Sequence, residues 1–165
     1  VACNRFGNAG VKYIADAMHH DSCVERLVLA SVGVGAEGAK QLADMLTVNT
    51  TLLHLDVGLM KSTAALSEIP NRIGNDGAIA IADSLRINKT LRSLSLLYNN
   101  IHQIGLDSIK GVPFNEFTRE EIKLCLRRNY LLLSEGDAAI VEEAVNPSHL
   151  REIVSVYRVN GSYSH

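Results

Sequence analysis

One glycine-rich segment has the spacing of a chemical site. Gly33-Val-Gly35-Ala-Glu-Gly38 matches the G-x-G-x-x-G pattern of dinucleotide-binding enzymes. The segment follows a predicted strand and opens a predicted helix, whose N-terminal amides would bind a phosphate. Asp56 ends the next predicted strand, 18 residues after Gly38, near the position of the acidic residue that binds the ribose in such sites. Taken alone, this segment predicts a dinucleotide-binding site.

Most of this glycine pattern recurs elsewhere in the chain. Gly35 and Gly38 have counterparts at Gly7 and Gly10 and again at Gly74 and Gly77, where no third glycine is present. Only Gly33 is extra, and stacked parallel strands lack the change of strand order at which nucleotides bind. We therefore favour a structural role for the glycines and keep dinucleotide binding at Gly33–Gly38 as a weaker alternative. On the structural interpretation, Gly33→Ala should leave the fold nearly unchanged.

Other reactive side chains lack the spacing of a known site. The three cysteines (Cys3, Cys23 and Cys125) form no C-x-x-C pair, and their odd number favours a reducing, cytoplasmic compartment over a disulfide framework. His19 and His20 end a predicted helix, where imidazole suits the helix dipole, and no third ligand stands at metal spacing. No G-x-S-x-G motif marks a nucleophile. We predict no cofactor, no metal site and no enzymatic activity.

Asn49, Asn88 and Asn160 each open an N-x-S/T tripeptide, the acceptor pattern for N-glycosylation. Asn49 and Asn88 stand at the same distance, 17 residues, after Val32 and Asn71. Both follow a predicted helix, where asparagine can end the helix in the left-handed conformation. We therefore interpret these two residues as helix caps.

Composition places the chain among ordinary globular domains. It has 165 residues, 47% of them hydrophobic, and a formal net charge of −2. A net charge this close to zero does not indicate a nucleic-acid partner or an acidic membrane surface. No apolar run reaches the roughly 20 residues that span a bilayer. We predict one domain over residues 1–165, with no nucleic-acid and no membrane partner.

One set of residues recurs along the chain about every 28 positions. The stretch Leu91–Ile101 reads L-x-x-L-x-L-x-x-N-x-I, and a glycine and an apolar helical pattern follow it. The intervals between successive units are 28, 39, 28 and 30 residues, so 11 residues are added in the second, and we place this insertion at about 58–70. The units open at Asn4, Val32, Asn71, Asn99 and Asn129.

On these residues the chain resembles the leucine-rich repeat family, in its longer, ribonuclease-inhibitor-like form. The resemblance implies an α/β solenoid, a right-handed β-α superhelix with parallel strands on the concave face and helices on the convex face. Val32 stands where the family has asparagine, so that unit departs from the family pattern. The asparagines of the other units should form a ladder through the stacked turns.

The physical pattern supports the same architecture. Apolar residues that alternate in predicted strands, such as Leu27 and Leu29 or Leu94 and Leu96, face one side of a sheet. Gly38, Leu42 and Leu46 line one side of a helix. One strand and one helix cannot bury these faces, but stacked copies can. The predicted helices are Asn8–His19, Ala36–Thr47, Asn75–Ile87, Ile104–Lys110 and Glu135–Val145, and the predicted strands are Glu25–Ala30, Leu53–Val57, Arg92–Leu97, Ile122–Leu126 and Arg151–Val156.

Val1 takes the last apolar position of a strand, so the chain is expected to begin inside a repeat as a fragment of a longer solenoid. An uncapped strand edge also makes edge-to-edge self-association an expected form of assembly.

The resemblance implies a protein-binding scaffold that holds its partner on the concave face. Alternation within the strands gives the side chains that should face the partner, and Tyr98 and the arginine pair extend the set beyond the strand ends. The candidate partner-binding residues are Arg26, His54, Asp56, Ser95, Tyr98, Lys123, Arg127 and Arg128. The insertion at 58–70 is a second candidate, because long loops on rigid scaffolds often carry function.

A regulatory role is the main alternative function. One family of GTPase activators resembles this repeat type, so a GTPase-activating or other regulatory protein is a second hypothesis. Hydrolysis rates measured over a panel of GTPases would test it.

Overall fold

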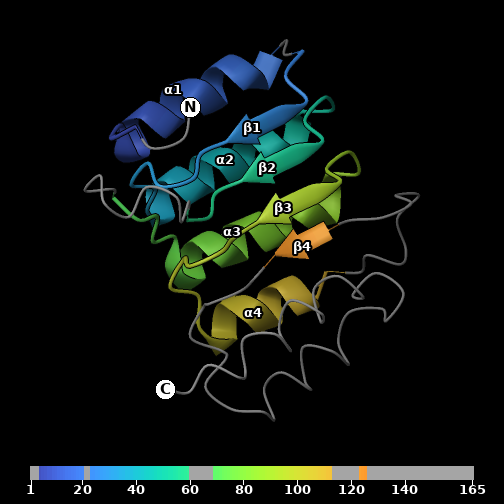
Figure 1. The fold of residues 1–165 in the computed structure, drawn as a ribbon. Coiled ribbons are helices and arrows are strands. Elements are labelled where there is room, and N and C mark those ends of the chain that lie inside the picture. Colours follow the sequence, from blue (N-terminus) through green and yellow to red (C-terminus); the bar gives the residue numbers. More distant parts are fainter. Residues whose placement is uncertain (1–3, 21–22, 60–68, 113–122, 126–165) are drawn as a thin grey trace.

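The computed structural model describes residues 4–20, 23–59, 69–112 and 123–125. Strands and helices alternate along these residues, and Figure 1 shows the strands side by side with the helices along one side of the sheet. The helices are α1 (Gly7–His20), α2 (Ala36–Val48), α3 (Gly74–Ile87) and α4 (Gln103–Lys110), and the strands are β1 (Arg26–Val28), β2 (His54–Asp56), β3 (Ser93–Ser95) and β4 (Lys123–Cys125).

The four strands form a parallel sheet in the order β1-β2-β3-β4. Leu27, Leu55 and Leu94 are register partners at its centre, and Leu124 continues the row on β4. Each helix between two strands returns the chain to the neighbouring position, so every unit of the sequence repeat becomes one layer of the stack. The predicted elements within the described residues agree with the observed ones to within two residues. The helix predicted at 135–145 and the strand predicted at 151–156 lie outside the described residues.

The hydrophobic core lies between the sheet and the helices. Leu27, Leu55 and Leu94 are buried, whereas the residues that flank them in each strand are exposed or half-buried. From the helices, Leu42 and Ile81 contribute fully buried side chains to the same cluster. This arrangement follows from the alternation in the strands and the four-residue spacing in the helices.

Buried asparagines tie the turns of neighbouring layers together. Asn99 donates from Nδ2 to the carbonyl oxygens of Val57, in the layer before, and Leu97, in its own layer, at 2.9 and 3.3 Å. Asn71 makes the equivalent bonds to Leu29 and Gly58 at 2.8 and 3.3 Å, and a further one to Val57 at 2.7 Å. Both side chains are almost completely buried. The predicted asparagine ladder is therefore present at these two turns.

The turn that holds Val32 in place of asparagine is well formed. Asn71 accepts from the backbone N–H groups of Val32 and Val34 at 3.1 and 2.9 Å, which satisfies this turn from the next layer. Val32 itself is fully buried. One side chain therefore serves two turns, and Asn99 does the same by donating to Leu97 in its own turn and accepting from the N–H of Ile73 in the turn before.

A second row of asparagines follows the helices, and it corrects the predicted left-handed caps. Asn49 and Asn88 have φ of −71° and −66°, which is extended backbone. Asn88 donates to the carbonyl oxygens of Leu46 and Asn49 at 2.8 and 3.0 Å, and Asn49 donates to that of Met18 at 2.9 Å. Their amides link one layer to the layer before it. Because these amides are buried and bonded, they are not glycosylation acceptors in this fold.

Two kinds of turn alternate between strands and helices. Gly7 and Gly74 have φ of 53° and 62° and start α1 and α3 directly. The turns before α2 and α4 each contain two residues with positive φ and then reach an extended residue before the helix. Those positive-φ residues are Ser31, Gly33, Tyr98 and Asn100. The layers therefore come in two forms that alternate along the chain.

An asparagine in the first turn of α1 and another in the first turn of α3 each cap the helix of the following layer. Asn8 Oδ1 accepts from the N–H groups of Gly35 and Gly38, at 2.7 and 3.1 Å. Asn75 Oδ1 does the same for His102 and Gly105, at 2.8 and 3.2 Å. The residues that precede α2 and α4 make no side-chain cap of their own, so the first-turn amides are satisfied from the preceding layer.

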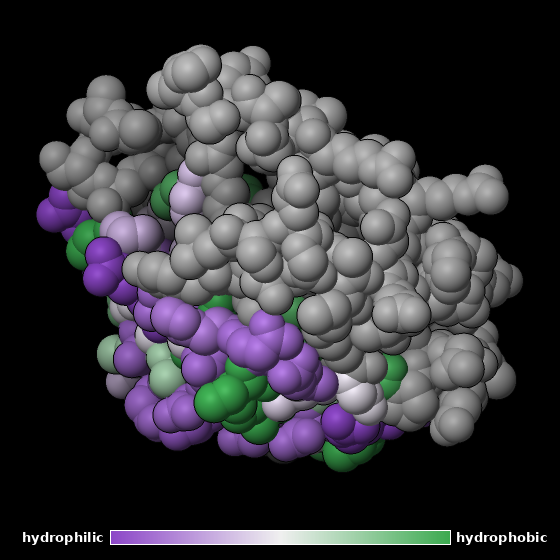
Figure 2. All heavy atoms as spheres, turned by 90° about the horizontal axis from the view of Figure 1, so that it is seen from below, coloured by the Kyte–Doolittle hydropathy of each residue, from purple (hydrophilic) through white to green (hydrophobic). Residues whose placement is uncertain are grey.

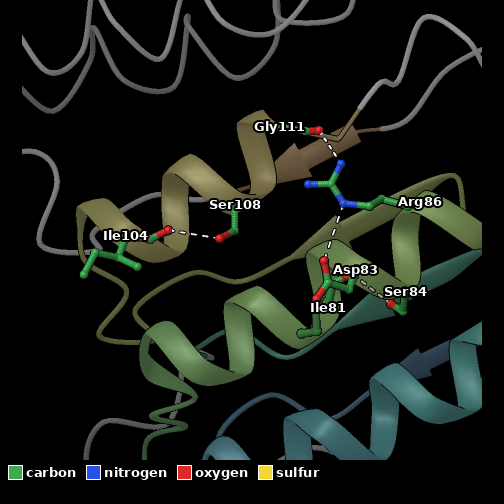
Figure 3. Close-up of polar contacts among 7 residues, drawn as sticks. All are labelled: Ile81, Asp83, Ser84, Arg86, Ile104, Ser108 and Gly111. Atoms are coloured by element: carbon green, nitrogen blue, oxygen red, sulfur yellow. Dashed lines mark hydrogen bonds and ion pairs between the residues drawn. The ribbon is translucent and has the colours of Figure 1, made fainter.

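Arg86 connects the ends of α3 and α4 (Figure 3). Its Nη1 donates to the carbonyl oxygen of Gly111, the residue that ends α4, and its Nε lies 3.4 Å from Asp83 Oδ1. A guanidinium at a helix C-terminus satisfies an open carbonyl and opposes the negative end of the helix dipole. Arg86 thereby holds α4 to the layer before it.

We expect Arg86→Ala to lower the free energy of unfolding by about 1 kcal/mol, because the side chain is 42% exposed and water weakens the contact. Chemical denaturation of the two proteins measures the difference. Asp83→Ala, which removes only the 3.4 Å ion pair, should change stability by less than about 0.5 kcal/mol. Equal losses in both variants would contradict the role given to Gly111.

No helix in the described ranges is long and apolar enough to cross a membrane.

Candidate protein-interaction surface

The side of the sheet that faces away from the helices is the surface predicted to be concave, and we call it the concave face. It is formed by the residues on either side of the buried leucines in β1, β2 and β3, all of them exposed or half-buried. These residues are Arg26, Val28, His54, Asp56, Ser93 and Ser95. Register places Arg26, His54 and Ser93 in one row and Val28, Asp56 and Ser95 in a second row.

Asp56 and Ser95, register partners on β2 and β3, both lie close to Gly58. Asp56 Oδ1 accepts from the N–H of Gly58 at 2.8 Å. A Cβ on Gly58 would lie 2.9 Å from Ser95 Oγ and 3.0 Å from Asp56 Oδ1. Glycine therefore leaves room for the carboxylate of β2 and the hydroxyl of β3 beside this backbone.

Tyr98 lies in the turn just beyond β3 with a backbone φ of 59°. Left-handed backbone is unfavourable for a bulky side chain, because its Cβ crowds the following carbonyl. Ser31 occupies the matching position two layers earlier, with φ of 54°. The turn itself therefore requires this conformation, and the chain places a half-buried tyrosine in it.

The structure brings together only part of the predicted site. Arg26, His54, Asp56 and Ser95 share the concave face, and Tyr98 lies at its edge. Lys123 is the register partner of Ser93 on β4. Arg127 and Arg128 lie outside the described residues. Sequence analysis missed Arg92, a half-buried arginine directly before Ser93. The backbone N–H of Arg92 donates to the carbonyl oxygen of Leu53 at 2.7 Å.

Comparisons with known proteins agree with this architecture. The family model described as "Leucine Rich repeat" matches residues 88–110. A solved structure titled "Leiomodin-1 Actin-Binding Site 2 (ABS2)" superposes with a TM-score of 0.61 at 19% sequence identity, covering 98% of this chain and 81% of that one. The fold is a leucine-rich repeat fold. No curated protein sequence gives a significant match.

The leucine-rich repeat packing accounts for the glycines that resembled a dinucleotide site. The amides of Gly35 and Gly38, which would bind a phosphate, already donate to Asn8. A Cβ on Gly38 would lie 2.7 Å from Asn8 Oδ1. Gly33, the extra glycine, has φ of 82°, and the Ile69 side chain lies over it, with Cγ2 3.0 Å from where a Cβ would be. These glycines therefore serve contacts between layers of the repeat.

The structure corrects the expectation that Gly33→Ala would leave the fold nearly unchanged. We expect a loss of about 1–2 kcal/mol in the free energy of unfolding, from the positive φ and the contact with Ile69. The double variant with Ile69→Ala should recover the steric part of this loss, and thermal denaturation of both variants measures it. An unchanged melting temperature for Gly33→Ala would contradict the crowding argument.

Titratable groups on the helices of the repeat are paired locally. Asp16, through a hydrogen bond and its charge, raises the pKa of Lys12 above its ordinary value, and Glu37 does the same for the pKa of Lys40. Both pairs are solvent-exposed and belong to single helices. Among the residues that the structure describes, no three His, Cys, Asp or Glu side chains gather to hold a metal ion.

Exposed apolar side chains are spread over several helices of the repeat. Tyr13, Ile87 and Ile104 are each more than half exposed, on α1, α3 and α4. Figure 2 shows the described part of the face seen from below as largely hydrophilic, with apolar atoms set among hydrophilic ones. Single apolar residues of this kind are normal on a soluble surface. The concave face is therefore the better candidate for binding.

Proposed function

We propose that this chain is a non-catalytic protein-interaction module that binds its partner on the concave face. The observation that carries the proposal is the alternation within β1, β2 and β3, where buried leucines alternate with exposed or half-buried side chains that are held in register and are polar except for Val28. The core fixes the leucines, so the polar rows stand on a rigid base. Rigid rows of polar side chains on one broad surface suit a protein ligand better than a small molecule.

The backbone at Tyr98 supports the same proposal. The turn requires a left-handed residue here, and the chain places a tyrosine there at a cost of about 1–2 kcal/mol, where glycine would avoid that cost. Tyrosine is also enriched among residues that dominate binding energy. We infer that Tyr98 is an anchor for the partner at the edge of the concave face.

The likeness to the leiomodin-1 structure supports one candidate partner. That structure is named for an actin-binding site, so monomeric actin is the first partner to test.

The 28-residue spacing between Arg26 and His54, with an α-helix in each connection, supports the ribonuclease-inhibitor-like form of the repeat. The exposed thiol of Cys23 suits a reducing compartment and supports the proposal of a cytoplasmic location.

Two variants test the concave face without assuming the chemistry of the partner. Ser95→Arg introduces a bulky side chain at its centre, and Tyr98→Gly removes the anchor while relieving the positive φ. Both should lose a partner that Ala17→Arg, on the exposed side of α1, retains. Binding of purified actin is measured first, and then capture of proteins from a cell lysate. Retention of the same partners by all three variants would contradict binding at the concave face.

A further inference from the structure

Two arginines flank His54 at the start of the strands. Arg26 is the register partner of His54 on β1, and Arg92 directly precedes Ser93, the register partner of His54 on β3. Neighbouring strands lie about 4.8 Å apart, so the backbones that carry the two arginines are about 10 Å apart, one on each side of His54. We call Arg26, His54 and Arg92 the arginine row.

The arginines of this row are not neutralised within the described part of the chain. Lys12 pairs with Asp16, Lys40 with Glu37 and Arg86 with Asp83, in each case within one helix. Neither Arg26 nor Arg92 forms an ion pair with another described residue. A guanidinium without a carboxylate partner retains the planar set of donors that binds a carboxylate through two parallel hydrogen bonds.

Negative charge on the same surface limits where an anion can bind. Asp56 lies two residues beyond His54 on β2, about 7 Å further along the strand. Glu25 is exposed beside Arg26 at the outer strand. An anionic group is therefore attracted to the arginine row and repelled by Asp56. This arrangement favours a ligand that runs across the strands, over their first residues, rather than along them.

We propose that the arginine row binds an acidic segment of the protein partner through its aspartate or glutamate carboxylates. Alternate side chains of an extended peptide are about 7 Å apart and flexible at their ends, so two carboxylates can meet both arginines. The inference rests on the proposed function, because it assigns the charge of the partner at the same concave face. It also gives a role to Arg92, which lies outside the strand alternation.

Fluorescence anisotropy with a labelled peptide that alternates glutamate and threonine tests the inference. Arg26→Gln and Arg92→Gln should each weaken binding about fivefold. Asp56→Asn should strengthen it about two- to threefold, because it removes a repelling charge. Arg72→Gln is the matched control: Arg72 is also exposed and outside every ion pair of the described residues, but it follows the turn rather than the strand. Its binding should stay within about twofold of the parent.

The outcomes separate this inference from the proposed function. Absence of binding, equal binding by the parent and both Arg→Gln variants, or an equal loss in Arg72→Gln would each overturn the acidic segment. Tighter binding of a peptide with glutamine in place of glutamate, or binding only of a phosphoserine version, would overturn it as well. If a partner is nevertheless lost in Ser95→Arg and Tyr98→Gly, the proposed function stands and only the charge assigned to the partner fails.

Discussion

Asn71→Ala should lower the free energy of unfolding by about 3 kcal/mol, an effect far larger than its single amide would contribute at a surface. The side chain is 1% exposed. It accepts from two backbone N–H groups, of Val32 and Val34, and donates to the carbonyls of two layers. Its removal leaves these buried groups without a partner, and an unsatisfied buried group costs about 1–3 kcal/mol.

Chemical denaturation of Asn71→Ala and of Arg72→Ala makes the comparison. Arg72 is the next residue and is exposed, so its loss should change stability by less than about 0.5 kcal/mol. Asn71→Asp keeps an acceptor for Val32 and Val34 but loses both donors, and it should be at least as unstable as the alanine variant. A cost below about 1 kcal/mol for Asn71→Ala would show that water replaces the amide in this turn.

Gly77→Ala should destabilise the protein by about 1–3 kcal/mol, the opposite sign from an ordinary glycine in a helix. Replacing a solvent-facing helical glycine by alanine usually stabilises a protein by about 0.5–1 kcal/mol. At Gly77 the new Cβ would lie 2.7 Å from the Cβ of Ile73 and 2.8 Å from that of Ala39. Both atoms are attached directly to backbone, so neither can rotate away.

Ala39 on α2, whose Cβ faces Gly77, offers an internal control for this prediction. Ala39→Gly removes one of the two crowded atoms, so the double variant should be more stable than the sum of the two single effects. Thermal denaturation of all four proteins measures this coupling. A gain in stability for Gly77→Ala alone would mean that α2 and α3 are further apart than the structure places them.

The strands, the helices and the core were predictable because their causes are local. Leu94 and Leu96 alternate, and Gly38, Leu42 and Leu46 recur at helical spacing, so each segment specifies its own buried side. Recurrence at 28 residues then fixes which segments become neighbours, and the parallel register follows. The same reasoning selected Arg26, His54, Asp56 and Ser95 as residues of one face.

The details that sequence could not give depend on contacts between layers. Asn49 carries the pattern of a left-handed cap, but its backbone is extended because its amide bonds to Met18 in the layer before. Val32 lacks the amide expected at its turn, and Asn71, 39 residues later, supplies it. No local pattern distinguishes these cases, since the deciding partner is distant in the chain.

The candidate site shows the same division. Alternation identifies side chains on the strands, but Arg92 precedes its strand and lies outside this pattern. The backbone conformation of Tyr98 is also invisible in the sequence, because nothing marks tyrosine as a residue with positive φ. Only the structure shows that Tyr98 shares this conformation with Ser31.

The alternation of the two turn types has a consequence for how such a chain can change length. Asn8 caps α2, and Asn75 caps α4. Ala36 holds the position in its unit that Asn8 and Asn75 hold in theirs, and it has no side-chain amide that could cap α3. Adding or deleting one repeat would place two layers of the same kind in contact, with an uncapped helix or an unused amide at the junction. Adding or deleting two would preserve every such contact, so duplications of this solenoid should survive in even numbers.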